Sequence, residues 1–363
     1  MRFRVRATPV LLLALLASCN KDYPNPFAGQ ITTHPPTADA ALVFTGNGWS
    51  STTGQGREVF SVNNAGASLT RLTFCNGDTR ACDTLEATLA PDRQRGILRV
   101  RDQDTNGDGV ISSEDGESLV YVDLTRQATA VLVEASQQVT GMDWSPNADL
   151  LVYSAQGIGG EDLFRTDPVR PTPDNQQQTR NLTCPSAPNG TTPACDRNIR
   201  ERRPRIDPTG SVACYERIGS DGKGQVWIFQ NQSTLLQVTS GGPGSEPLTG
   251  TPYRVGSDAD PVFAPNVESI VFRRLTATGN GGLGSWDILA VDIDGSNLRT
   301  LVTGPAWRSA PDWGRDNTIV FAETDPVTGV PSLIRINADG GGRSPILSLA
   351  AGFLLDNPRW LAR

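Results

Sequence analysis

Hydrophobic residues in this 363-residue chain fall into short runs of four to seven, separated by turns rich in Gly, Asp, Asn and Pro. Runs such as GILRVRD (96–102), LLVYSAQ (150–156) and SIVFRRLT (269–276) are dominated by β-branched and aromatic residues, which favour strands over helices. No segment carries a helical pattern of apolar positions. The pattern therefore predicts an all-β fold built from many short strands.

The runs recur as a repeating unit. Each unit opens with a segment that ends in an aromatic or aliphatic anchor residue, followed by a turn and three further runs. The anchor residues, spaced 47 to 62 positions apart, are Leu89, Trp144, Ile206, Phe263, Trp313 and Trp360. Four strands per unit at this spacing predict a β-propeller, whose blades repeat every 40 to 50 residues or so. The recurring tryptophans at 144, 313 and 360 are then expected in the core between blades.

The two ends of the chain predict how the ring closes. The first copy, beginning at ALVFTGN (41–47), has three strands but no anchor strand, and the last copy, DNPRWLAR (356–363), is an anchor strand alone. We therefore expect the C-terminal strand to complete the first blade, which gives six blades over residues 40–363 and protects the sheet edges.

Strings such as GMDWSPNADLLVY (141–153) and DILAVDIDGSNLRTLV (287–302) resemble the repeat of TolB-like six-bladed propellers. The resemblance covers residues 40–363 and implies a protein-binding or scaffolding module of the cell envelope. The family's namesake carries an additional N-terminal domain, whereas here residues 19–39 are expected to form a flexible linker.

The N-terminus predicts export. Three arginines at positions 2, 4 and 6 precede the apolar run Val10–Ala17, as in a secretory signal peptide. The string Leu16-Ala17-Ser18-Cys19 resembles the bacterial lipobox, which implies cleavage after residue 18 and lipid attachment at Cys19. An ordinary cleaved signal with an incidental cysteine is the alternative. The residue after Cys19 is Asn20, not Asp, so the resemblance implies an outer-membrane lipoprotein that faces the periplasm or the cell surface.

Charge and cysteine content agree with an exported protein. Without the three signal arginines, 29 basic and 39 acidic side chains remain, a net charge of −10, which argues against nucleic-acid binding. Two local cysteine pairs, Cys75 with Cys82 and Cys184 with Cys195, predict disulfides in an oxidising compartment. Metal binding by these pairs is the weaker alternative, and Cys214 is expected as a buried free thiol.

Histidine content limits the chemistry. The chain has one histidine, His34, in a Pro-rich stretch, and no G-x-S-x-G motif. Histidine-based catalysis is therefore close to excluded, and we expect a monomeric binding protein that contacts the membrane through its lipid alone. A carbohydrate-active or other hydrolase working through paired carboxylates is the alternative. The G-x-G-x-x-G string at Gly279–Gly284 lies between two predicted strands, so it indicates a hairpin loop and not a nucleotide site.

The loop DQDTNGDGVISSEDGE (102–117) resembles an EF-hand or dockerin calcium loop inserted in a strand hairpin. Its predicted Ca²⁺ ligands are Asp104, Asn106, Asp108, Val110, Ser112 and Asp115. Gly109 would permit the sharp turn, and the ion would have a structural role. An acidic, solvated loop without an ion is the alternative.

Propellers commonly bind ligands at one mouth of the central channel, near the start of the anchor strands. The charged residues expected at that mouth are Glu86, Arg202, Arg203, Asp258, Asp260 and Asp356. Their mixed signs do not identify a substrate, and solvated or paired surface charges are the alternative.

Overall fold

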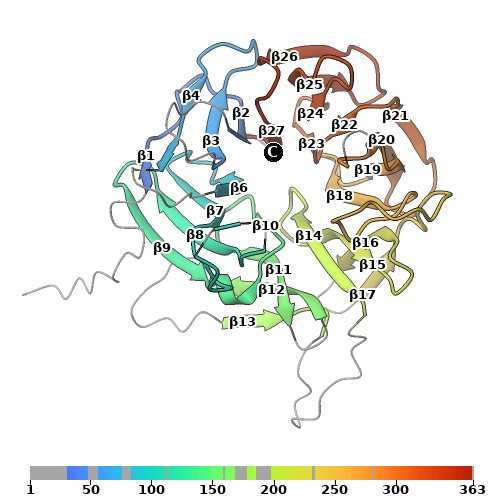
Figure 1. The fold of residues 1–363 in the computed structure, drawn as a ribbon, viewed down its shortest axis with the longest axis horizontal. Helices are drawn as coiled ribbons and strands as arrows, with labels where there is room; N and C mark the ends of the chain where they lie inside the picture. Colours follow the sequence, from blue (N-terminus) through green and yellow to red (C-terminus); the bar gives the residue numbers. More distant parts are fainter. Residues whose placement is uncertain are drawn as a thin grey trace, which may run out of the picture.

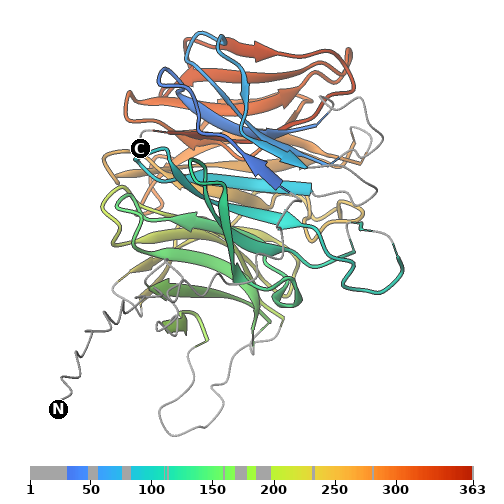
Figure 2. The same ribbon diagram turned by 90° about the vertical axis from the view of Figure 1, so that its left-hand side faces the viewer.

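The computed structural model describes residues 31–47, 56–75, 83–109, 111–112, 114–157, 160–167, 178–184, 198–230, 234–279 and 282–361. These residues form sheets, antiparallel within each blade, that are arranged around a common axis (Figure 1), and we call the region along this axis the channel. Turned by 90°, the same ring shows the strands of the blades in side view (Figure 2). The all-β, six-bladed propeller predicted from the sequence is confirmed.

Blades 1 to 3 each contain four strands. From the channel outward, the strands of blade 1 are β27 (Leu355–Trp360), β2 (Leu42–Gly46), β3 (Glu58–Val62) and β4 (Thr70–Arg71). Those of blade 2 are β6 (Asp83–Leu89), β7 (Arg95–Arg101), β8 (Ser118–Asp123) and β9 (Ala128–Val133). Those of blade 3 are β10 (Gly141–Trp144), β11 (Leu151–Gly157), β12 (Gly160–Asp167) and β13 (Gln178–Asn181).

Blades 4 to 6 repeat the arrangement. The strands of blade 4 are β14 (Arg200–Ile206), β15 (Ala213–Ile218), β16 (Gly224–Gln230) and β17 (Thr234–Gln237). Those of blade 5 are β18 (Asp258–Phe263), β19 (Ser269–Ala277), β20 (Ser285–Asp292) and β21 (Arg299–Val302). Blade 6 has a divided inner strand, β22 (Trp307–Arg308) and β23 (Asp312–Trp313), followed by β24 (Thr318–Thr324), β25 (Pro331–Asn337) and β26 (Ser344–Ser348).

Closure of the ring follows the prediction. The C-terminal strand β27 pairs antiparallel with β2, so that Trp360 lies opposite Leu42 and Leu355 opposite Gly46. Residues from the two ends of the propeller therefore share one sheet, with β27 next to the channel (Figure 1). This pairing removes the open edge that β2 would otherwise present to solvent.

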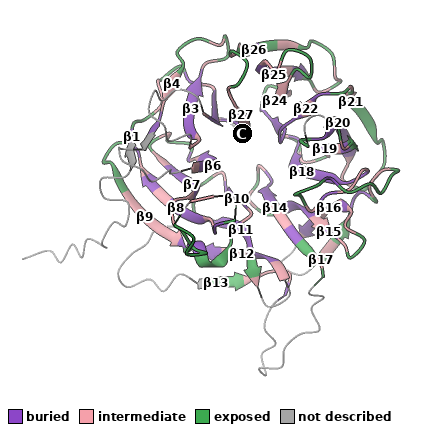
Figure 3. Ribbon diagram, in the orientation of Figure 1, coloured by how far each residue is buried: buried purple, intermediate pink, exposed green. Residues whose placement is uncertain are grey.

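The hydrophobic core lies between neighbouring blades. Each blade packs an apolar face against the next, and one cluster joins Val43 and Leu72 of blade 1 to Leu98 and Val120 of blade 2. The inner strands are largely buried, whereas the outermost strands are mostly exposed or intermediate (Figure 3). The tryptophans at positions 144, 313 and 360 belong to three such clusters and are at most 8% exposed, which confirms them as core between blades.

The predicted linker differs from the structure at its C-terminal end. Residues Ile31–Thr33 form β1, which pairs with β5 (Thr73–Cys75), and the N–H of His34 donates to the carbonyl of Leu72 at 2.8 Å. The pairing with β1 gives hydrogen-bond partners to backbone N–H and C=O groups of β5. The signal peptide, Cys19 and the rest of the linker lie outside the described residues.

Helical structure is minimal in the described part of the chain. A single 3₁₀ turn, η1 (Ala135–Gln137), follows β9. No described helix has the length and apolar character needed to cross a membrane. The described residues of the glycine string at 279–284 lie between β19 and β20, which pair as a hairpin as predicted; residues 280 and 281 lie outside the described residues.

Candidate functional site

The six charged residues predicted at the channel mouth all lie on inner strands. Glu86 is on β6, two arginines (202 and 203) are on β14, two aspartates (258 and 260) are on β18, and Asp356 is on β27. These positions fall in the first half or at the middle of their inner strands. We call the end of the channel at which the inner strands start the proximal mouth. The other end, where the inner strands finish at the anchor residues, is the distal mouth.

Three inner strands carry the same irregularity at the same repeat position. Arg203, Asp260 and Asn357 each stand three residues before an anchor residue and directly before a proline. Their φ angles are 51°, 53° and 47°, in the left-handed region that residues other than glycine rarely adopt. The strand registers shift at these points, so each is a β-bulge. Bulges redirect side chains and are common beside binding sites.

The bulged residues connect neighbouring blades. Arg203 of blade 4 forms an ion pair with Asp260 of blade 5, which also pairs with Arg273. The side-chain amide of Asn357 in blade 1 donates to the carbonyl of Leu85 in blade 2 at 2.7 Å. The redirected side chains therefore hold adjacent blades together around the channel.

The other predicted carboxylates also contact arginines. Glu86 lies 3.2 Å from Arg99 and is bonded to Arg359, and Asp258 accepts a hydrogen bond from Arg274 at 2.8 Å. On β14, Arg202 lies 3.0 Å from Glu161. The carboxylates predicted at the mouth are thus paired with cations and do not form an isolated carboxylate pair.

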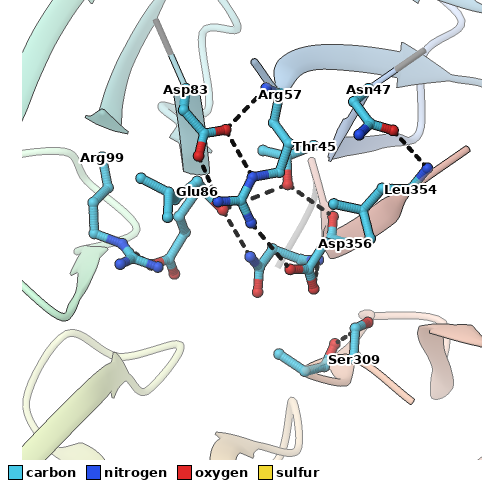
Figure 4. Close-up of polar contacts among 12 residues, drawn as sticks. Thr45, Asn47, Arg57, Asp83, Glu86, Arg99, Ser309, Leu354 and Asp356 are labelled. Carbon is cyan, nitrogen blue, oxygen red and sulfur yellow. Dashed lines mark hydrogen bonds and ion pairs between the residues drawn. The ribbon is translucent and has the colours of Figure 1, made fainter. Parts of the chain in front are cut away.

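Blades 1 and 2 meet at the proximal mouth in a network of both signs (Figure 4). The guanidinium of Arg57 donates to both carboxylate oxygens of Asp83 at 2.8 Å and lies 3.8 Å from Asp356. Thr45 donates to the carbonyls of Leu85 and Asp356 at 3.4 and 3.3 Å. The charged side chains of this network are about one-fifth exposed, so they are positioned and still reachable from solvent.

Deeper in the channel lies a group of alternating charges that sequence analysis missed. Asp143, Arg205, Asp312 and Arg359 each stand one residue before an anchor residue. Arg359 lies 2.8 Å from Asp143, Arg205 lies 3.7 Å from Asp143, and Arg205 also pairs with Asp312. All four are at most 6% exposed. We call them the charge plug; their ion pairs link blades 1, 3, 4 and 6.

Backbone contacts fix the two aspartates of the charge plug. The N–H of Ile206 donates to Asp143 at 2.8 Å, and the N–H of Trp360 donates to Asp312 at 2.7 Å. Each carboxylate therefore bonds the backbone of another blade as well as an arginine. An alignment of the repeats would have shown a charged residue at this position in four of the six copies.

Burial and pairing shift the acidities of the channel carboxylates in opposite directions. Burial alone would raise the pKa of Asp260, but Arg203 and Arg273 outweigh it and hold the pKa at about 2. Burial raises the pKa of Glu216 on β15 to about 7, helped by the charge of Asp260. The hydroxyl of Tyr253 donates to Glu216 at 3.1 Å. The sequence did not point to Glu216, because channel residues were expected on the anchor strands and Glu216 lies on the second strand of blade 4.

The predicted calcium loop joins β7 to β8, and its Val110 lies outside the described residues. The carboxylate of Asp104 accepts the N–H groups of Gly107 at 2.6 Å and Gly109 at 2.7 Å. The amide of Asn106 donates to Asp108 at 3.2 Å, which brings oxygen donors from three ligand positions together. This donor set is of the kind that Ca²⁺ prefers.

The last ligand position of the loop has a different environment. Asp115 accepts the N–H groups of Thr105 at 2.8 Å and Ser112 at 2.7 Å and is 6% exposed. These bonds lower its pKa, the bond from Ser112 most. No group of three or more His, Cys, Asp or Glu side chains suited to a metal occurs among the described residues. Asp115 therefore closes the loop through its own backbone in this conformation.

The cysteines are only partly within the described residues. Cys214 is a buried free thiol, as predicted, and burial raises its pKa. Cys184 is buried. Cys82 and Cys195 lie outside the described residues, and so does the side chain of Cys75. Both disulfides stay predictions.

The fold is similar to that of known propellers, although no family model and no curated protein matches the chain. TolB from Acinetobacter baumannii superposes with a TM-score of 0.62 at 12% identity, over 91% of this chain and 68% of that one. Puromycin hydrolase gives 0.52 at 14% identity, over 87% of this chain and 45% of the enzyme. The tricorn protease gives 0.52 at 13% identity, over 88% of this chain and 26% of the protease. At such identities the likeness shows a shared propeller fold.

Proposed function

We propose that this protein is a lipid-anchored β-propeller of the cell envelope that binds another protein at the proximal mouth and has no catalytic activity. The observation that carries the proposal is the network of Arg57, Asp83 and Asp356. Its charges have both signs, are held in place by pairing and stay partly exposed. Interfaces between proteins use such complementary, pre-positioned charges at a polar rim. The likeness to the TolB fold supports the same proposal.

A hydrolase that works through paired carboxylates is the second candidate, since puromycin hydrolase contains a similar propeller. Such an enzyme needs two accessible carboxyl groups, one of them protonated near neutral pH. Glu216 has a raised pKa, but it is 0% exposed and lies beside two arginines and Tyr253. Glu86, Asp258 and Asp260 are paired with arginines. These contacts favour the binding protein.

The binding proposal is tested by capture from detergent-solubilised envelopes. Arg57→Gln removes the charge that holds Asp83 and Asp356, while Arg299→Gln changes an exposed arginine on β21 and serves as the matched control. We expect the wild-type protein and the control to retain the same partner and Arg57→Gln to lose most of it. Unchanged thermal melting would show that the variants are folded. Capture of nothing above a bead control, or equal capture by all three proteins, would contradict the proposal.

Membrane attachment is proposed to depend on the lipid at Cys19. Replacing Cys19 by Ser would remove the thiol that accepts the lipid, so the protein should move from the membrane fraction to the soluble fraction. Fractionation of cells followed by immunoblotting measures the distribution. Equal membrane retention of Cys19→Ser and wild type would contradict lipidation.

We also propose that the loop at 102–117 binds one structural Ca²⁺. The residues that would hold it are Asp104, Asn106, Asp108, Val110, Ser112 and Asp115. When bound, the ion would supply a positive charge at the centre of the acidic turn and hold the loop in one conformation.

A further inference from the structure

A pocket of about 230 Å³ opens at the distal mouth, on the opposite side of the charge plug from the Arg57 network. Residues of blades 1, 2, 3, 4 and 6 line it, so it lies on the channel axis. Its lining is about equally polar and apolar, and the apolar part includes Leu89, Trp144, Ile206 and Trp360.

The charged residues of this distal pocket all have one sign. They are Arg93, Arg315 and Arg359, and no Asp or Glu is among its described lining residues. This is unusual in a chain with a formal net charge of −7. The pocket therefore presents donors and positive charge to whatever enters it.

The three arginines differ in whether they already form hydrogen bonds or ion pairs within the chain. Arg359 is 2% exposed and pairs with Asp143, and Arg93 donates to the carbonyl of Ala38 at 2.9 Å. Arg315 is exposed, and no hydrogen bond or ion pair joins it to the described part of the chain. Arg315 is thus the charge at the rim that is available to a ligand.

Two indole N–H groups of the same pocket have no acceptor among the described residues. Trp144 and Trp360 are 6% and 8% exposed, and neither Nε1 atom has a hydrogen-bond partner. Trp313 stands at the same repeat position but does not line the pocket, and its Nε1 donates to Asn317 at 3.0 Å. Buried donors are normally satisfied, and these two are among fourteen buried side-chain atoms without a hydrogen-bond partner in the described part of the chain. Both belong to residues that line the pocket, where a ligand could supply the acceptor.

We propose that the distal pocket binds a small organic carboxylate that carries an aromatic or aliphatic group. Arg315 would pair with the carboxylate, the indole N–H groups would supply further donors, and the apolar part of the lining would contact the hydrocarbon part. The volume is below the roughly 300–1,000 Å³ of pockets for drug-sized ligands, which limits the ligand to a small acid. The site lies at the mouth opposite the proposed protein-binding surface and does not depend on it.

The test is isothermal titration calorimetry of the purified protein at low salt with 3-phenylpropanoate and with its neutral amide, 3-phenylpropanamide. We expect saturable binding of the acid and no measurable binding of the amide. Arg315→Gln should weaken binding of the acid about tenfold or more, because a charge-assisted bond is lost. Arg299→Gln changes an exposed arginine on the outer strand β21 that does not line the pocket, and it should leave binding unchanged.

A second variant tests the indole donors. Trp360→Phe keeps an aromatic wall and removes one N–H, so it should weaken binding of the acid. Its melting curve should show that the protein is folded. Equal binding of acid and amide, absence of binding by both, or unchanged affinity in Arg315→Gln would each overturn the proposal. None of these results depends on capture of a protein partner at the proximal mouth.

Discussion

At the scale of single residues, Arg359 illustrates how the centre of the ring is held. Its guanidinium contacts Asp143 of blade 3 at 2.8 Å and Glu86 of blade 2, although it belongs to the C-terminal strand of blade 1. It is 2% exposed, so these charges interact with little screening by water. Removal of Arg359 would leave Asp143 and Glu86 buried with one arginine fewer each. Arg205 would remain beside Asp143, and Arg99 beside Glu86.

Replacing Arg359 by Met should therefore destabilise the fold strongly. Loss of one partner from a buried ion pair costs about 3–5 kcal/mol. Urea denaturation followed by tryptophan fluorescence measures the change, with Arg299→Met on the exposed strand β21 as the control. Equal stability of the two variants would contradict the stabilising role of the charge plug.

Glu216 gives the molecule a pH dependence near neutrality. Its pKa is raised from 4.5 to about 7 by burial, so the folded state binds a proton more tightly than the unfolded state. The associated stability is present in full below the unfolded pKa and is lost as pH rises through the folded pKa. Burial also raises the pKa of Glu201 to about 7, so this residue contributes to the pH dependence of stability over the same pH range.

Glu216→Gln should flatten this dependence, because a neutral amide neither gains nor loses a proton. Between about pH 5 and about pH 8 the wild-type protein should lose up to about 3 kcal/mol more stability than the variant. Denaturation with urea at both values measures the difference, and Glu268→Gln at an exposed position is the control. A wild-type protein that gains stability from about pH 5 to about pH 8 relative to Glu216→Gln would show that the sign is wrong.

At the scale of elements, the loop between β7 and β8 is an insertion in an otherwise regular hairpin of blade 2. The strand pattern of blade 2 continues on both sides of this loop, where β7 and β8 pair in unbroken register from Arg95 to Val100. The acidic insertion at 102–117 is therefore tolerated as an addition to an intact hairpin. Its order depends on side chains such as Asp104, which bonds the backbone of the turn.

Calcium should raise the melting temperature of the wild-type protein if the proposed ion binds this loop, because a ligand that binds the folded state stabilises it. The double variant Asp104→Asn with Asp108→Asn should lose this response. Asp294→Asn, in the exposed turn between β20 and β21, is the matched control. Differential scanning calorimetry with calcium and with chelator measures the shift, and a midpoint unaffected by calcium in the wild-type protein would exclude the ion.

At the scale of the whole molecule, the ring depends on pairing between its two ends. The strand β27 supplies the inner strand of blade 1, Trp360 packs against blade 6, and Arg359 is a member of the charge plug. Loss of one short strand would therefore open a sheet edge, remove core contacts and unpair buried carboxylates at once.

A chain that ends after Leu354 should fail to unfold cooperatively and should aggregate, whereas one that ends after Leu361 should behave as the wild type. Analytical ultracentrifugation and thermal melting distinguish the two. Addition of a synthetic peptide with the sequence of residues 355–361 should restore a cooperative transition to the shorter chain. A monomeric, cooperatively melting chain without β27 would refute closure as the basis of stability.

Much of the fold could be predicted from the amino-acid sequence because its signals are local. The short β-branched runs and the turns between them predict the strands, the spacing from Leu89 to Trp360 predicts the blades, and the unequal first and last copies predict the closing strand. The prediction of a flexible linker over residues 19–39 was wrong near its C-terminal end, since β1 forms there by pairing with β5, about forty residues away. A short edge strand of this kind has no local pattern that distinguishes it from a linker.

The sequence by itself determined which residues repeat, and with them the strand order and the tryptophan core. Only the tertiary structure decided which charges meet. Asp143, Arg205, Asp312 and Arg359 are ordinary polar positions in four separate repeats until the ring places them on one axis. The distal pocket, which Arg315, Trp144 and Trp360 line together, arises in the same way. Strand formation is decided by neighbours along the chain, whereas the pairing of buried charges is decided by distances across the channel, and these exist only after the blades have packed.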